Sequence, residues 1–118
     1  MATQKYHDDS RGLLAQARYE LAEGDVRQAS EKGWGAVALM LKAIAERRGW
    51  EHGKHRQLSR VASRLRSETG NRDVFRYYQV ADSLHGNFYE DELPPRDIAD
   101  ALDDVEQLLD LLEPLTRV

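Results

Sequence analysis

Apolar side chains recur at every third or fourth residue along most of this 118-residue chain, and glycine or proline interrupts the pattern. This spacing places apolar residues on one face of an α-helix, and no window alternates polar and apolar residues as a strand does. Gly24, Gly49 and Gly70 suit helix ends because glycine tolerates a left-handed backbone, whereas Pro95 suits a first helical position. The pattern predicts five helices, over about 9–23, 25–48, 54–68, 72–87 and from 95 to Pro114.

The expected turns between these helices are short, which favours antiparallel neighbours. A chain of this length can also enclose one hydrophobic core. We therefore expect an all-α fold, an antiparallel up-down bundle of four to five helices. It should form a single domain over residues 1–118, with its core at about residues 10–112.

Two of the expected helices carry more apolar surface than one face needs. Trp34 lies beside the main stripe of the second helix, and the last helix has a wide leucine face, made of Leu108, Leu109, Leu111, Leu112 and Leu115. Surplus apolar surface on a small bundle is commonly covered by a second copy. We therefore expect a homodimer.

Composition excludes several classes of protein. The chain has no cysteine, so it has neither a disulfide framework nor a thiolate metal site. No apolar run approaches the roughly 20 residues that cross a bilayer, and the first ten residues are too polar for a signal-peptide core. We expect a cytoplasmic protein with no membrane partner, no metal and no other cofactor.

The net charge of −4 conceals two blocks of opposite sign. From Lys42 to Arg66 there are eight lysines or arginines against two glutamates, and from Glu90 to Glu113 there are ten acids against one arginine. In the basic block a stripe recurs every four residues, formed by Arg56, Arg60 and Arg64. Guanidinium groups suit phosphate, so the stripe could follow a nucleic-acid backbone. The alternative is a solvated face paired with the acids of the last helix.

Gly33-Trp34-Gly35 lies inside the second helix, where each glycine costs about 1 kcal/mol relative to alanine. Either helices approach closely there with the indole packed over the gap, or the indole forms a shallow slot for a planar ligand such as a base.

His52 and His55 lie three residues apart near the start of the third helix. Structural roles, contact with an anion or RNA, and a metal site all fit this pair, although a metal would lack further ligands.

The strongest candidate site lies between Arg76 and Tyr89. Three- and four-residue steps bring polar side chains close together on one helix, including Gln79, Asp82 and His85. Histidine exchanges protons near neutral pH, and a carboxylate such as Asp82 could hold its tautomer. A partly buried histidine with satisfied hydrogen bonds explains the same residues.

Three stretches together resemble the archaeal PaREP family, within the HEPN group of helical nucleotide-binding domains. They are Ala29-Ser30-Glu31-Lys32-Gly33-Trp34-Gly35-Ala36, Leu84-His85-Gly86-Asn87-Phe88-Tyr89-Glu90 and Leu93-Pro94-Pro95. The resemblance covers about residues 10–112 and implies a helical bundle that pairs face to face. It also implies binding of a nucleotide or RNA, or a partner role beside a nucleotidyltransferase.

Some HEPN relatives are metal-independent ribonucleases with an arginine four to six residues before a histidine. His85 matches that histidine, but Val80 and Gln79 stand five and six residues before it, and Arg76 stands nine before it. The resemblance therefore favours binding over cleavage.

We expect a module that binds a nucleotide or RNA, with ligand contacts from Asn87, Tyr89, Gln79, Arg56, Arg60, Arg64 and Trp34. One alternative is a metal-independent endoribonuclease that uses His85, Arg76 and Asp82. Another is a purely structural or antitoxin-like partner.

Overall fold

A computed structural model of the chain describes residues 2–117, and the side chains of residues 4–117. The two ends of the predicted domain, residues 1 and 118, lie outside the described residues. Five α-helices and a final 3₁₀ turn follow one another: α1 Ala2–Ala22, α2 Val26–Arg48, α3 His55–Thr69, α4 Arg72–Glu90, α5 Pro95–Leu112 and η1 Glu113–Arg117. No strand occurs between residues 2 and 117. The predicted all-α fold is confirmed.

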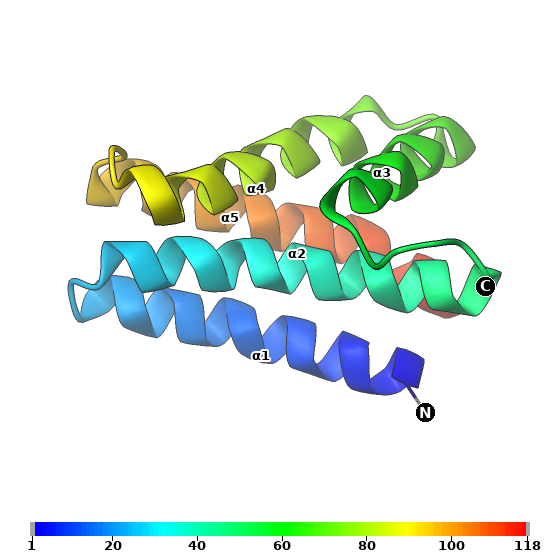
Figure 1. Ribbon diagram of the computed structural model, residues 1–118, viewed down its shortest axis with the longest axis horizontal. Coiled ribbons are helices and arrows are strands. Elements are labelled where there is room, and N and C mark those ends of the chain that lie inside the picture. The colour runs from blue at the N-terminus through cyan, green and yellow to red at the C-terminus, as the bar shows by residue number, and fades with distance from the viewer. Residues whose placement is uncertain (1, 118) are drawn as a thin grey trace.

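The helices form the expected antiparallel up-down bundle, with α3 set apart from the rest (Figure 1). α1, α2 and α5 run alongside one another, and α4 packs on α2 and α5. α3 contacts α2 and α4, and it touches neither α1 nor α5 within the described residues. This short helix is therefore attached to the bundle along one side.

The helix ends mostly follow the sequence prediction. Gly49 and Gly70 end α2 and α3 with φ of 72° and 67°, in the left-handed region that favours glycine. The Asp25 carboxylate accepts a hydrogen bond from the backbone N–H of Gln28 at 3.1 Å and so caps α2. α1 begins earlier than predicted, at Ala2. Its first turns carry an ion pair between Lys5 and Asp9, four residues apart, which supports the helix there.

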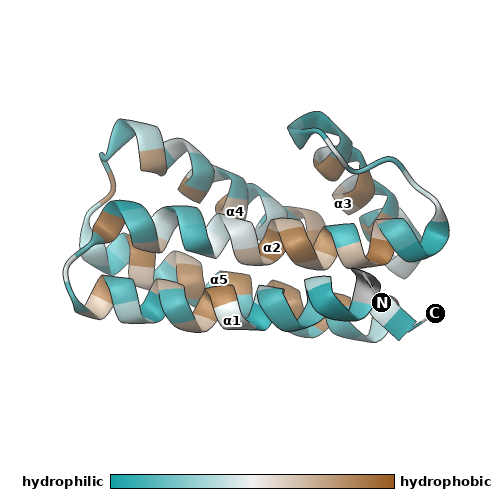
Figure 2. Ribbon diagram, turned by 60° about the horizontal axis from the view of Figure 1, so that its bottom comes forward, coloured by the Kyte–Doolittle hydropathy of each residue, from teal (hydrophilic) through white to brown (hydrophobic). Residues whose placement is uncertain are grey.

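The wide leucine face of α5 is buried within the chain. Leu108, Leu109 and Leu112 are fully buried, while Leu111 and Leu115 are partly buried against the core. Apolar residues of α2 and α5 gather where these helices face their neighbours (Figure 2). Among side chains 4–117 the exposed large hydrophobic residues are Tyr19 and Tyr89. The surplus surface that led us to expect a homodimer is thus covered by the chain itself, and the homodimer stays a prediction.

Gly33 permits the close helix approach that the sequence predicts. A Cβ atom there would lie 2.6 Å from Cδ2 of Leu102 in α5 and 3.0 Å from Cδ1 of Leu84 in α4. The indole of Trp34 packs against rings of α3 and α4. Its packing over the gap at Gly33 stays a prediction.

The acids of α5 pair with α1 and not with the arginines of α3. Arg11 Nη2 lies 2.9 Å from Asp110 Oδ1, and Arg18 Nη1 lies 3.0 Å from Asp103 Oδ1. The expectation that the acids of the last helix neutralise the arginine stripe is therefore wrong. The physical reason is that α3 and α5 are not in contact.

No helix within the described residues is long and apolar enough to cross a bilayer.

Candidate functional site

Three rings from three different helices meet on one side of the bundle. The Trp34 ring of α2 stacks on the His55 ring of α3 at a centroid distance of 5.0 Å, and it lies 5.3 Å from the His85 ring of α4. The two imidazoles are themselves stacked, 5.3 Å apart with an interplanar angle of 26°. Tyr89 meets the His85 ring edge-on at 5.6 Å.

Two carboxylates complete this group. His55 Nε2 lies 2.7 Å from Asp82 Oδ1, and His85 Nδ1 lies 3.4 Å from Glu31 Oε2. Each imidazole therefore has its own acid and keeps its second ring nitrogen away from that acid. We call the group the histidine cluster, and it consists of Glu31, Trp34, His55, Asp82, His85 and Tyr89.

Helix periodicity explains how α2 and α4 supply most of the histidine cluster. Glu31 and Trp34 lie three residues apart on α2, and Asp82, His85 and Tyr89 follow at steps of three and four on α4. Such spacings place side chains on one face of a helix. Because α2 and α4 are packed against each other, the two faces meet.

The position of His55 depends on how α3 begins. His55 is the first residue of α3, directly after Lys54. The Lys54 backbone N–H donates to Gln57 Oε1 at 3.0 Å, and Gln57 Nε2 donates to Glu51 Oε2 at 2.9 Å. These bonds fix the first turn, which directs the imidazole of His55 toward α4.

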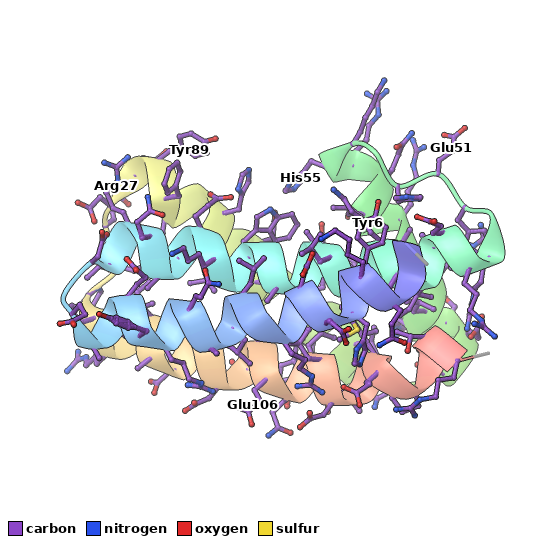
Figure 3. All side chains as sticks on the ribbon, turned by 90° about the horizontal axis from the view of Figure 1, so that it is seen from below. Tyr6, Arg27, Glu51, His55, Tyr89 and Glu106 are labelled. Atoms are coloured by element: carbon purple, nitrogen blue, oxygen red, sulfur yellow. The ribbon has the colours of Figure 1, made fainter. Side chains whose placement is uncertain are left out.

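The histidine cluster has a buried floor and an exposed rim. The Trp34 residue is 6% exposed, whereas the side chains of His55 and His85 are 47% and 31% exposed. Tyr89 is 69% exposed. Figure 3 shows His55 and Tyr89 on the same side of the bundle, so the rim faces solvent from both α3 and α4.

Some buried polar atoms of this region lack an ordinary hydrogen bond. Among the described residues, the buried side-chain atoms without a hydrogen bond are Glu31 Oε2, Tyr78 Oη and His85 Nδ1, and the first and last of these face each other at 3.4 Å. The Tyr78 ring meets Trp34 at 5.9 Å, and its hydroxyl lies near the Ser59 hydroxyl of α3. Burial raises the pKa of Tyr78 to about 12, and the Asp82 carboxylate adds to the rise. Buried polar groups are normally paired, and here the contacts of Glu31 with His85 and of Tyr78 with Ser59 are looser than ordinary hydrogen bonds.

Asp82 and Arg76 do not have the contacts that the sequence suggested. We expected Asp82 to orient His85, but its carboxylate contacts His55, and Glu31 takes the place beside His85. Arg76 is exposed and pairs with Asp73 at 3.1 Å on its own helix. It lies nine residues before His85, or about two and a half turns, and so points from the opposite face of α4. Arg76 is not part of the histidine cluster, and neither is the exposed Gln79.

The side chain of Asn87 stabilises the turn that follows α4. It is 3% exposed, and its Oδ1 accepts hydrogen bonds from the backbone N–H groups of Glu92 and Leu93, each at 2.8 Å. Its Nδ2 donates to Ser30 Oγ at 2.9 Å. The amide that we expected to contact a ligand is thus engaged within the fold.

The arginine stripe lies on another flank of α3. Arg56, Arg60 and Arg64 are all exposed, and the Arg64 guanidinium carbon lies 3.8 Å from the centroid of the Trp50 ring. His52 also lies on that side, where its Nδ1 is 2.8 Å from the backbone oxygen of Trp50. No group of acids and histidines among the described residues is arranged to hold a metal ion.

Two members of the histidine cluster were not expected as partners of His85. Glu31 stands three residues before Trp34 on α2, and this helical spacing is a signal that the sequence contains. His55 lies thirty residues before His85, so only the packing of α3 on α4 reveals their stacking.

Comparisons with known proteins give a family and a fold. The family model described as the archaeal PaREP1/PaREP8 family matches residues 5–109. The chain is similar to a protein from Sulfolobus solfataricus whose crystal structure has been solved, with a TM-score of 0.75 and 21% identity. The match covers 98% of this chain and 96% of that chain, and at this identity it shows the fold alone. No curated protein matches the chain.

Proposed function

We propose that this chain, which belongs to the archaeal PaREP1/PaREP8 family, binds a nucleotide or RNA through the histidine cluster. The observation that carries the proposal is the stack of Trp34, His55 and His85, with centroid distances of 5.0 to 5.3 Å and two partly exposed imidazoles. Membership of the HEPN superfamily is part of the same proposal. The helical bundle and His85 support it.

The exposed rings suit a flat ligand. Unstacked bases commonly pack on aromatic side chains, and histidine is among those that serve. The rim formed by His55 and His85 offers ring surface to solvent, and the 69% exposed Tyr89 adds a side wall. A base that covers these rings removes apolar ring surface from water without any movement of Trp34.

The carboxylates favour a base with hydrogen-bond donors. Glu31 and Asp82 place carboxylate groups beside the rings of His85 and His55. Carboxylate oxygens accept hydrogen bonds from exocyclic amino groups, as they do from the amino group of cytosine. We therefore expect a base with an amino group, such as cytosine or adenine, to bind better than uracil.

The test measures equilibrium binding of nucleotides and short single-stranded RNAs by fluorescence anisotropy. Tyr89→Ala and His85→Ala should each weaken binding about tenfold or more, because stacking contributes on the order of 1–3 kcal/mol per base. Tyr19→Ala is the matched control, since Tyr19 is 55% exposed and lies on α1 away from the histidine cluster. Equal losses from Tyr19→Ala and Tyr89→Ala would exclude the cluster as the site.

The chain has two tryptophans, which allows a second readout. In a Trp50→Phe background the emission comes from Trp34 alone, beneath the two imidazoles. A bound base should change that emission along the same titration curve as the anisotropy. Binding with no change in Trp34 emission argues for a site elsewhere.

Cleavage of RNA without a metal is a second candidate function. The observation that favours it is the pair of stacked imidazoles, each with a separate carboxylate. One imidazole would take the proton of a ribose 2′-hydroxyl as its oxygen attacks phosphorus, and the other would give a proton to the departing 5′-oxygen. The products are a 2′,3′-cyclic phosphate and a free 5′-hydroxyl. In this version His55 is the second proton-transfer group, and Arg76, which pairs with Asp73 on the opposite face of α4, takes no part.

Incubation of labelled RNA with the protein in EDTA tests the second candidate. For a nuclease, His55→Ala and His85→Ala should each lower the rate by about 10²- to 10⁴-fold. His7→Ala is the control because His7 contacts Asp8 and Glu113, far along the bundle from the histidine cluster. Absence of cleavage, or cleavage that survives both substitutions, removes this candidate and leaves the binding proposal in place.

If neither binding nor cleavage is found, the remaining proposal is that the chain is a structural or antitoxin-like partner of another protein. The homodimer is tested separately by light scattering at micromolar concentration, where a monomer contradicts it.

A further inference from the structure

The arginines of α3 differ from most other arginines of the chain in having no acidic partner. Arg11 and Arg18 of α1 each contact two carboxylates of α5 or η1, and Arg48 of α2 pairs with Glu68. On α3, no ion pair with any described residue is formed by Arg56, Arg60, Arg64 or Arg66. Arginine in an acid-rich chain usually finds a carboxylate, so α3 carries positive charge that the fold leaves unneutralised.

Two of these arginines line a cavity of about 320 Å³ between α3 and the loop that follows α2. Arg60 and Arg64 form one side, and Trp50 and Glu51 of the loop form the other. The guanidinium carbon of Arg64 lies over the Trp50 ring, 3.8 Å from the ring centroid. This stacking orders the guanidinium and leaves its N–H edge available for hydrogen bonds.

We propose that this cavity binds a phosphate ester with a neighbouring hydroxyl group, the chemistry of a ribose phosphate. Arg60 and Arg64 bind the phosphate, since each guanidinium can donate two parallel hydrogen bonds to its oxygens. Glu51 accepts a hydrogen bond from the hydroxyl. Gln57 holds this carboxylate by donating to its Oε2 at 2.9 Å, which leaves Oε1 for the ligand.

The phosphate site is separate from the histidine cluster and does not depend on the proposed function. Arg60 and Arg64 lie five and nine residues after His55, which is about 7.5 and 13.5 Å along the axis of α3. His55 faces Asp82 of α4, whereas Arg64 faces Trp50 on the other flank of α3. Two sources supply this chemistry: a free nucleotide or sugar phosphate, and the backbone of an RNA strand that crosses α3.

Calorimetric titration with ribose 5-phosphate, and with inorganic phosphate as the simpler probe, tests the site. Arg60→Gln and Arg64→Gln should each weaken binding of ribose 5-phosphate about tenfold or more, as expected for hydrogen bonds to a charged group. Arg66→Gln is the matched control, because Arg66 is an exposed arginine of the same helix that does not line the cavity. It should change binding less than twofold. Arg64→Lys keeps the charge but not the planar fork, and should weaken binding as Arg64→Gln does.

Two results would overturn the proposal. One is an equal loss from Arg66→Gln and Arg64→Gln, which would show that general charge and not the cavity attracts the probe. The other is a Glu51→Gln variant that leaves the preference for ribose 5-phosphate over inorganic phosphate unchanged, because Glu51 is assigned to the hydroxyl.

His85→Ala separates this site from the proposed function, since it should leave the binding of ribose 5-phosphate unchanged. A single-stranded RNA that displaces ribose 5-phosphate identifies the site as a backbone site, and an RNA that does not displace it identifies a free phosphate ester as the ligand.

Discussion

The motif around His85 contains residues of two kinds, those with surface open to a ligand and those bonded within the fold. The His85 side chain is 31% exposed and lies over the buried Trp34 ring, while its Nδ1 faces Glu31, so the exposed ring surface is open to a ligand. Asn87, from the same short motif, has its amide bonded on both sides within the fold. A motif of adjacent residues can therefore combine a site with the structure that supports it.

Asn87→Ala should lower the free energy of unfolding by about 3 kcal/mol, because it leaves three groups without a hydrogen bond and each costs about 1–3 kcal/mol, with part-buried groups at the low end. The backbone N–H groups of Glu92 and Leu93 lose their acceptor, and Ser30 Oγ loses its donor. Unfolding in urea, followed by circular dichroism, measures the change.

Ser30→Ala is the control for this prediction. Ser30→Ala removes two hydrogen bonds, the one that the hydroxyl donates to the backbone oxygen of Val26 and the one that it accepts from Asn87 Nδ2. The turn after α4 keeps its bonds to Asn87 Oδ1, so this change should cost only about 1 kcal/mol. A cost for Asn87→Ala no greater than that for Ser30→Ala would show that the turn after α4 does not depend on the amide.

At the level of the helices, α3 is the element that carries most of the proposed chemistry. It supplies His55 to the histidine cluster and Arg60 and Arg64 to the second cavity, yet it packs on α2 and α4 alone. Its buried residues are Leu58, Val61, Ala62 and Leu65. An element with few buried apolar contacts opens more readily than the core helices, and sites that must admit a ligand commonly use such elements.

Replacing a helix glycine by alanine shows whether the glycine is there for close packing, because the substitution otherwise stabilises a helix. Gly12→Ala in α1 should raise the free energy of unfolding by about 1 kcal/mol, because nothing lies within 4 Å of the added Cβ. Gly33→Ala should lower it by about 1 kcal/mol, since the added Cβ would lie 2.6 Å from a fully buried Leu102 and overpacking outweighs the gain in propensity. Thermal unfolding of both variants checks the opposite signs. Stabilisation by Gly33→Ala would contradict the close packing of α2 on α5.

At the level of the whole molecule, opposite charges are divided between two sides. The acids of α5 and η1 bind the arginines of α1 and close one side of the bundle, with Arg11 Nη2 2.7 Å from Glu113 Oε1 and Arg18 Nη2 2.6 Å from Glu106 Oε1. The positive charge of α3 remains on another side. The uneven charge of the sequence thus becomes an uneven charge of the surface, and this arrangement favours an anionic partner at α3.

The contact between α1 and η1 should make stability depend on pH in the acid range. Hydrogen bonds from Arg11, and then from His7, lower the pKa of Glu113 from its usual 4.5. The stabilisation is therefore fully present above pH 4.5 and is lost as the pH falls through the lower pKa of the folded state. Glu113→Gln should cost up to about 1 kcal/mol at pH 7 and little at a pH well below the folded value.

Urea unfolding of the variant and the unaltered protein at several pH values measures this difference. Glu90→Gln is the control, because Glu90 is exposed and forms no ion pair with a described residue. A difference for Glu113→Gln that stays constant from pH 7 to pH 3 would exclude the carboxylate as the titrating group.

Much of the fold follows from the sequence alone, since periodicity and chain breaks are local properties. The three- and four-residue spacing of apolar side chains predicted all five helices, and the glycines at 49 and 70 marked two of their ends. The end of α4 was placed three residues too early. Its last turn is closed by Asp91, a non-glycine residue with φ of 53°, and by the side chain of Asn87, which no local rule distinguished from a ligand contact.

Tertiary structure decided which of the polar residues act together. The sequence shows His55, Glu31 and His85 on three separate helices, and the order of the chain does not specify which faces meet. The packing of α3 on α4 brings His55 to Asp82 and His85, while the distance of α3 from α5 leaves its arginines unpaired. Helix formation depends on near neighbours in the chain, whereas the pairing of side chains across helices depends on how the apolar faces of all five helices are buried at once.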